Sequence, residues 1–272
     1  MGNIKENLFV KQIINIEKKI YFNLLNHKLE IESEKRRNGW IDTRYQALLK
    51  LKDKYAGERC FIIGMGPSLT EEDLNMIKKE FTFGMNSIAL KFDKDTWRPT
   101  FYGIQDIYVY PKVEQALLNE NKKKSNTIYL VGSTICKKFN VPKNWIQYPL
   151  NAAYHKYEAR IHKYFAKADD NCYAVVYDGY SVTYSLAELA MYMGFKEIYL
   201  IGTDCNYEKN KKQHFLEYGY QDKNYITVGE SMIIAFKSLK KLADQHGIKI
   251  FNVTRGGMLE VFPRIKLEDI YK

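Results

Sequence analysis

The chain has 272 residues, 46% of them hydrophobic, and 42 basic against 32 acidic residues give a net charge of +10. This length suffices for one large α/β domain or for a domain with an appendage. No apolar run reaches the roughly 18 residues of a membrane span, and the N-terminus lacks a signal-peptide core, so we expect a cytoplasmic protein. The charge favours an anionic partner, but the lysines are spread in small groups, so we expect no nucleic-acid partner.

The first 56 residues are expected to form a helical extension, and residues 57–272 a nucleotide-binding catalytic domain. Apolar residues at helical spacing, with charges between them, predict helix over residues 4–54. Such a region packs on the core, self-associates in a homo-oligomer, or makes a peripheral contact with the inner face of a membrane. The sequence leaves these three roles open.

The segment 59–69 is the most informative part of the chain. An apolar run at 60–63 predicts a strand buried on both faces, Gly64 and Gly66 then break it, and a helix is expected over 70–79. Glycines let the backbone approach a ligand, and a helix N-terminus favours an anion, which predicts a nucleotide or phosphate site. The alternative is an ordinary β–α turn. The motif matches neither the dinucleotide fingerprint nor the P-loop, so neither an NAD enzyme nor a P-loop NTPase is supported.

Strands and helices are expected to alternate along the rest of the chain. Strands are predicted at 60–64, 81–85, 100–104, 127–131, 197–202 and 248–253. The remaining helices are predicted at 112–119, 150–166, 181–193 and 228–246. This alternation of strands and helices predicts an α/β fold. We expect a Rossmann-like, mostly parallel sheet flanked by helices, with the N-terminal helical extension outside it.

Polar residues that directly follow the predicted strands are the candidate site residues, because ligands of open parallel sheets bind at the carboxyl ends of strands. They are Gly64, Gly66 and Ser68, then Asn86, then Gln105 and Asp106, then Asp204, Asn206 and Tyr207. Asp204 could accept ribose hydroxyls, or it could be a turn residue. Ser181 and Thr183 could hold a phosphate at a helix N-terminus, or Ser181 could simply cap that helix.

His214 is the candidate general base, because imidazole titrates near neutral pH. The alternative is a solvated loop histidine. The other four histidines fall on predicted helices and are expected to be structural. The four cysteines are scattered without metal-type spacing, so we expect free thiols and no metal site.

Four stretches, Phe61–Leu69, Gly84–Ser87, Tyr102–Asp106 and Gly194–Asp204, resemble the DUF115 superfamily. That superfamily includes the central domain of the Maf flagellin-modifying proteins and the MptE-like hydroxymethylpterin diphosphokinases. The pattern is also similar to the bacterial family 42 sialyltransferases. This second resemblance implies a GT-A-variant Rossmann fold, metal-independent transfer without a cofactor, and a CMP-sugar donor.

The resemblance also implies roles for individual residues. Gly64, Gly66 and Ser68 would face the nucleotide, with Met65 standing where the family usually has Asn. Asn86 and Gln105 would lie near the donor, Ser181 beside the nucleotide, and Asp204 by the ribose. The family's catalytic histidine aligns with Glu230, and its phosphate-binding tyrosine falls on Asn206, next to Tyr207. Either Glu230 or His214 would then serve as the base.

The expected function is a glycosyltransferase that uses a nucleotide-activated sugar in bacterial surface polysaccharide or glycoprotein biosynthesis. Its acceptor would be a saccharide or a lipid-linked molecule. One alternative is a 6-hydroxymethylpterin diphosphokinase-like pyrophosphoryl transferase, which would need ATP and Mg²⁺ held by carboxylates such as Asp106 and Asp204. Another is a non-catalytic nucleotide-binding or scaffold protein.

Overall fold

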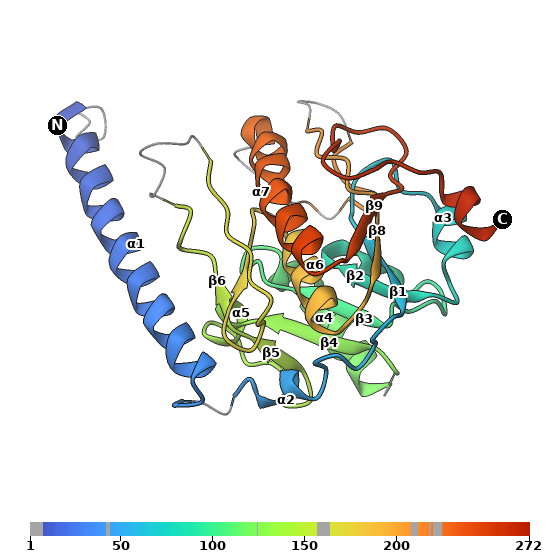
Figure 1. Ribbon diagram of the computed structural model, residues 1–272, viewed down its shortest axis with the longest axis horizontal. Helices are drawn as coiled ribbons and strands as arrows, with labels where there is room; N and C mark the ends of the chain where they lie inside the picture. Colours follow the sequence, from blue (N-terminus) through green and yellow to red (C-terminus); the bar gives the residue numbers. More distant parts are fainter. Residues whose placement is uncertain are drawn as a thin grey trace.

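The computed structural model describes residues 8–41, 44–123, 125–156, 164–207, 212–217, 219 and 225–272. Seven parallel strands form one twisted sheet with the order β5-β4-β3-β2-β1-β8-β9 (Figure 1). These strands are β1 (Arg59–Ile63), β2 (Phe81–Met85), β3 (Phe101–Ile104), β4 (Ile128–Gly132), β5 (Ile146–Tyr148), β8 (Glu197–Ile201) and β9 (Lys249–Asn252). The predicted Rossmann-like α/β fold is confirmed.

Helical segments connect the strands. They are α3 (Glu71–Met76), the 3₁₀ helix η2 (Asn86–Lys91), α4 (Tyr110–Lys122), α5 (Ser133–Cys136), α6 (Val182–Tyr192), α7 (Tyr225–Gln245) and the terminal 3₁₀ helix η3 (Leu267–Tyr271). α6 packs on β1, β2 and β3, and α7 lies beside α6 next to β9. The chain runs from β1 toward β5 on one side and adds β8 and β9 on the other. The order therefore reverses beside β1, the topological switch point at which open sheets bind ligands.

The local sequence accounts for the elements around this point. β1 and β8 are apolar runs whose last four residues are buried, as expected for central parallel strands. α3 begins with a capping box, in which the Thr70 hydroxyl accepts the N–H of Asp73 and the Asp73 carboxylate accepts the N–H of Thr70. Every residue of α6 is buried, so this helix forms the centre of the core.

The helix predicted over 150–166 is wrong in the part that the structure describes. Residues Leu150–Asn151 form strand β6, which pairs with β7 (Val176–Tyr177) in a small second sheet. The buried side chain of Asn151 accepts the N–H groups of Ala153 and Tyr154, which turns the chain where a helix would continue. Residues 157–163 lie outside the described residues. The short elements η2, α5, β5, β6, β7 and η3 were not predicted.

At the N-terminus, helix α1 (Leu8–Arg37) confirms most of the predicted helical region, but the helix does not extend to residue 54. It stops before Gly39, whose φ of +70° suits glycine, and only the short α2 (Gln46–Leu49) follows. Tyr45, Leu48 and Leu51 are buried, so this stretch contributes to the core. Among the described residues, no helix combines the length and apolarity needed to cross a membrane.

Candidate functional site

A cavity of about 80 Å³ opens at the carboxyl ends of β1, β2 and β8, at the switch point of the sheet. Ten of the fourteen predicted site residues line it, and an eleventh, Ser68, donates a hydrogen bond to the lining residue Asp204. The ten are Gly64, Met65, Gly66, Asn86, Ser181, Thr183, Asp204, Asn206, Tyr207 and His214. The cavity is smaller than the roughly 300 Å³ of a typical small-molecule site, so a nucleotide would lie partly outside it.

The glycine turn after β1 is built against the matching turn after β8. The N–H of Gly64 donates to the Ile201 carbonyl at 2.7 Å, and that of Gly66 donates to the Gly202 carbonyl at 2.8 Å. A Cβ on Gly64 would collide with the Gly202 carbonyl, and one on Gly66 with the Asp204 carboxylate. Both glycines are therefore required by the protein's own packing, whether or not a ligand also approaches them.

Asp204 is held at this junction by Ser68, whose hydroxyl donates to its Oδ2 at 2.8 Å. Burial raises the pKa of the Asp204 carboxyl, and the hydrogen bonds from Ser68 only partly oppose this effect. The next residue, Cys205, has a φ of +49°, an uncommon conformation for a residue with a side chain. The fold thus keeps a half-buried carboxylate at the edge of the cavity, at an energetic cost.

Because the half-buried Asp204 carboxylate is costly in its charged form, Asp204→Asn is expected to change the protein's stability in a pH-dependent way. Because the folded-state pKa of Asp204 is raised, its contribution to stability is greatest below the unfolded pKa and is lost as pH rises through the folded pKa. The melting temperature of Asp204→Asn relative to the wild type should therefore increase between about pH 4 and pH 7. Thermal unfolding at several pH values measures this difference. A difference that stays constant or shrinks with rising pH would contradict it.

Asn86 contributes an amide to the cavity from an unusual backbone conformation. Its φ is +48°, its carbonyl accepts the Tyr102 hydroxyl at 2.7 Å, and it begins η2 directly after β2. Its buried Oδ1 finds no hydrogen-bond partner within the part of the chain that the structure describes. A strained residue with an unsatisfied acceptor facing a cavity is typical of a ligand-binding position.

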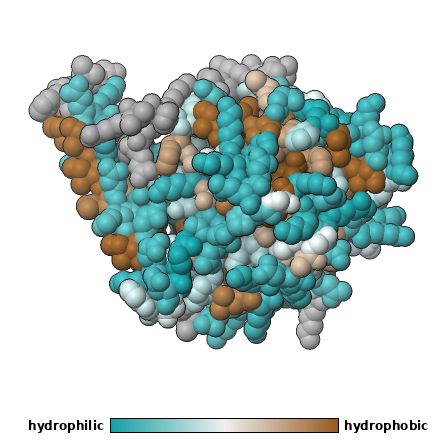
Figure 2. Space-filling view, in the orientation of Figure 1, coloured by the Kyte–Doolittle hydropathy of each residue, from teal (hydrophilic) through white to brown (hydrophobic). Residues whose placement is uncertain are grey.

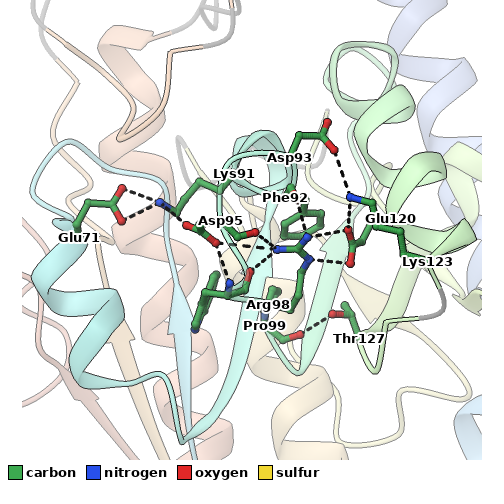
Figure 3. A network of polar contacts seen from close by, with 11 residues as sticks. Glu71, Lys91, Phe92, Asp93, Asp95, Arg98, Pro99, Glu120, Lys123 and Thr127 are labelled. Atoms are coloured by element: carbon green, nitrogen blue, oxygen red, sulfur yellow. Dashed lines mark hydrogen bonds and ion pairs between the residues drawn. The ribbon is translucent and has the colours of Figure 1, made fainter.

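A charged network anchors the far end of η2 (Figure 3). Lys91 Nζ lies 2.7 Å from Glu71 on α3 and 3.0 Å from Asp95. Arg98 donates to the carbonyls of Phe92, Trp97 and Asp95 and pairs with Glu120 on α4, with Nε 2.7 Å from Oε1. The Arg98 hydrogen bond lowers the pKa of the Glu120 carboxyl. The network therefore fixes the segment that begins with Asn86.

The N-terminus of α6 forms a second wall of the cavity. The Ser181 hydroxyl caps the helix by accepting the N–H of Thr183, and the Thr183 hydroxyl lies 3.4 Å from the sulfur of Met85. Further along α6, the buried Glu188 carboxylate accepts the N–H groups of Asp169 and Tyr177. These two hydrogen bonds hold the segment that precedes α6 against the helix. The capping role of Ser181 is observed, and the positive end of the dipole of this eleven-residue helix lies at the cavity.

His214 lines the cavity from a segment that crosses the glycine turn. The N–H of Phe215 donates to the Met65 carbonyl at 2.7 Å, and the N–H groups of Gln213 and His214 both lie 3.2 Å from Glu217 Oε1. His214 is thus tied to the glycine turn through the neighbouring residue. Tyr207 faces Met232 of α7, 3.6 Å from hydroxyl to sulfur.

Besides Ser68, three predicted site residues do not line the cavity. Gln105 is buried and accepts the Tyr148 hydroxyl, and Asp106 accepts the N–H of Tyr108 at the start of α4. Glu230 is exposed on α7. It follows Gly229, at which a Cβ would collide with the Cys205 carbonyl.

Conversely, Met85, Gln213 and Met232 line the cavity without having been predicted. Gln213 precedes His214, and this adjacency is the signal in the sequence that could have found it.

Two further predictions about site chemistry concern metals and thiols. Within the described residues, no group of three or more His, Cys, Asp or Glu side chains is placed to hold a metal ion. Cys60, Cys172 and Cys205 are buried free thiols, and Cys136 is partly buried.

His155 was predicted to lie on a helix, but it lies in a turn, with Nδ1 3.3 Å from Asp178 Oδ1. Burial lowers the pKa of this imidazole.

The fold and the cavity define an open parallel α/β protein with a polar site at its topological switch point. The sequence model of the family described as "6-hydroxymethylpterin diphosphokinase MptE-like" matches residues 41–210, more than half of the chain. The chain therefore belongs to this MptE-like family, and the resemblance inferred from the glycine motif is confirmed. No curated protein matches the chain.

Two solved structures resemble the chain. The structure of the Maf glycosyltransferase from Magnetospirillum magneticum AMB-1 is 14% identical, with a TM-score of 0.46, and the match covers 82% of this chain and 38% of that one. The sialyltransferase CstII from Campylobacter jejuni, in complex with the substrate analogue CMP-3FNeuAc, is 15% identical, also with a TM-score of 0.46. That match covers 76% of this chain and 86% of CstII. The chain thus spans well under half the length of the Maf structure.

Proposed function

We propose that the protein is a glycosyltransferase that takes a nucleotide-activated sugar, with a CMP-sugar as the first donor to test. The observation that carries the proposal is the gathering of the glycine turn, the α6 N-terminus, Asp204 and His214 around one cavity. A hydroxyl-binding carboxylate, an anion-binding helix end and a base are the groups that such a transfer requires. The proposed setting is bacterial surface polysaccharide or glycoprotein biosynthesis.

In the proposed reaction, the imidazole of His214 takes a proton from an acceptor hydroxyl. The acceptor oxygen then forms a bond to the anomeric carbon of the sugar, and the bond between that carbon and the donor phosphate oxygen breaks. The electron pair leaves with the nucleotide. The Thr183 hydroxyl and the positive end of the α6 dipole would stabilise the negative charge on the departing phosphate.

A pyrophosphoryl transfer is the second candidate, because the family's description names a diphosphokinase. Such chemistry uses Mg²⁺ held by carboxylates. Asp204 is the one carboxylate in the described lining of the cavity, while Asp106 accepts the N–H of Tyr108 outside it. This placement supports sugar transfer over pyrophosphoryl transfer as the first proposal.

A thermal-shift panel of CMP, CMP-sugars, UDP-sugars, GDP-sugars and ATP, each with Mg²⁺ or with EDTA, tests the proposal. A ligand at 100 times its Kd raises the free energy of unfolding by about 2.7 kcal/mol. For a chain of this size, that corresponds to an increase in melting temperature of about 5–10 °C. We expect this increase for a sugar nucleotide in EDTA, followed by sugar transfer or donor hydrolysis.

Two matched variants separate the candidates. Asp204→Asn should abolish the shift, and Asp106→Asn should leave it unchanged. A shift seen only with ATP and Mg²⁺, and lost in both variants, would replace the glycosyltransferase by the diphosphokinase. A nucleotide shift with no turnover of any donor would indicate a binding or scaffold protein.

A further inference from the structure

Helix α1 carries apolar residues on both faces. Its face toward the core holds the buried polar residues Asn26, Ser33 and Arg36 together with the partly buried Phe22, Leu25 and Leu29. Asn26 Oδ1 accepts from Asn151 at 2.9 Å, and the Arg36 guanidinium donates to the Ala174 carbonyl. Large apolar residues also lie on the exposed face. A helix that packed only on its own core would leave that face polar.

Four exposed residues form what we call the α1 stripe. Ile13, Ile20, Leu24 and Ile31 are 41%, 55%, 65% and 43% exposed. At about 100° per residue, all four fall within about 20° of one line along the helix. Brown side chains follow α1 at the edge of the molecule in Figure 2. Ile13 and Ile31 are five turns, or about 27 Å, apart.

Within the part of the chain that the structure describes, the N-terminal half of α1 has little packing. Residues 11–18 are all exposed, and this half projects away from the sheet (Figure 1). A helical segment of about 15 residues is marginal by itself in water, so a partner surface would stabilise this half.

The spacing of the stripe identifies that partner. Ile13 and Ile20 are as far apart as Leu24 and Ile31, so the stripe is symmetric about residue 22. We propose that α1 pairs antiparallel with α1 of a second copy of this chain, with Ile13 facing Ile31 and Ile20 facing Leu24 across a two-fold axis. A self-complementary patch is what a two-fold interface between identical chains requires.

The charged residues beside the stripe are also arranged for the antiparallel pair. Glu17 and Lys28 lie on the same flank of the stripe, on opposite sides of its centre. In the antiparallel pair, Glu17 of each copy therefore comes within one residue's rise of Lys28 of the other. Lys28 is 72% exposed and lies 4.0 Å from Glu32 of its own helix, so its ammonium group is accessible.

Sedimentation of the full chain over a range of concentrations tests this inference. We expect a dimer for the wild type and a monomer for Ile20→Glu combined with Leu24→Glu. The control Lys18→Glu, on the opposite face of the same exposed half, should remain dimeric. A wild type that is monomeric at every concentration, or a dimer that survives the double substitution, would overturn the pairing.

A charge exchange tests the register without placing a charge in the stripe. Glu17→Lys and Lys28→Glu should each raise the dimer Kd by about 2- to 30-fold, because exposed ion pairs contribute little and the dimer contains two of them. Combining both substitutions should restore it. No restoration would contradict the register.

Cross-linking and vesicles complete the test. Mixed chains carrying Ile13→Cys and Ile31→Cys should form a disulfide with each other on oxidation, and Ile13→Cys alone should not. A disulfide between two copies of Ile13→Cys would show a parallel pair instead.

Vesicle binding tests the alternative that the stripe contacts a membrane. This alternative would hold if the protein is monomeric, binds phosphatidylglycerol vesicles, and stops binding them after Ile20→Glu with Leu24→Glu.

Discussion

Replacing His214 by alanine is expected to lower the turnover of sugar transfer by about 10²- to 10⁴-fold, because a positioned general base contributes that much. Donor affinity should stay nearly unchanged, since Asp204, the glycine turn and α6 remain in place. Steady-state kinetics, together with calorimetry of the nucleotide donor, separates the two effects. The rate loss should appear in kcat and leave the donor Kd within a factor of a few.

Glu230→Gln is the matched comparison, because Glu230 is the other base that the sequence resemblance implies. Glu230 is exposed on α7 and does not line the cavity, whereas His214 does. We therefore expect Glu230→Gln to have a much smaller effect on turnover. Normal turnover by His214→Ala with the true acceptor, or a larger loss in Glu230→Gln, would transfer the base role to Glu230.

Replacing Arg98 by alanine is expected to destabilise the protein by about 3–5 kcal/mol, because the buried Glu120 carboxylate then keeps only its longer contact with the exposed Lys123. The Glu120 side chain is only 4% exposed, and three backbone carbonyls lose the same donor. Denaturant unfolding measures the loss, which corresponds to a fall in melting temperature of about 6–20 °C. Donor affinity should also fall, because the anchored segment begins with Asn86.

Lys123→Ala is the control for this network. Lys123 is 52% exposed and lies 3.4 Å from Glu120 and 3.5 Å from Asp93, so its removal should cost about 1 kcal/mol or less. Equal losses in the two variants would show that the network is a set of surface pairs and does not hold η2 in place.

Much of the parallel sheet could be predicted because its strands are continuous apolar runs, and the turns that end them carry their own signals. The β1 glycine turn and the Ser181 cap appear where the sequence predicts them, and a Thr70–Asp73 capping box begins the helix expected after the turn. Local hydrogen bonds within a few residues determine these features. Short elements such as β5 and η2 lack such signals, because three to six residues give too little periodicity.

The glycines show where local interpretation was incomplete. Gly66 was expected to give a ligand access to the backbone, yet its missing Cβ also makes room for the Asp204 carboxylate, far away in the sequence. Gly66→Val would therefore disturb the protein itself and is a poor test of ligand binding. Asp204→Asn is the better probe, because it changes the charge and keeps the shape.

By itself, the sequence determined the class of fold, the glycine turn and which residues follow the strands, because these depend on neighbours along the chain. Tertiary structure alone decided which of those residues share a cavity. It joined His214 to Met65 through Phe215 and kept Gln105, Asp106 and Glu230 outside. It also buried Asn26, Ser33 and Arg36 of α1 and left the apolar stripe of this helix exposed. Such placements depend on contacts between distant segments, for which a single sequence carries no local pattern.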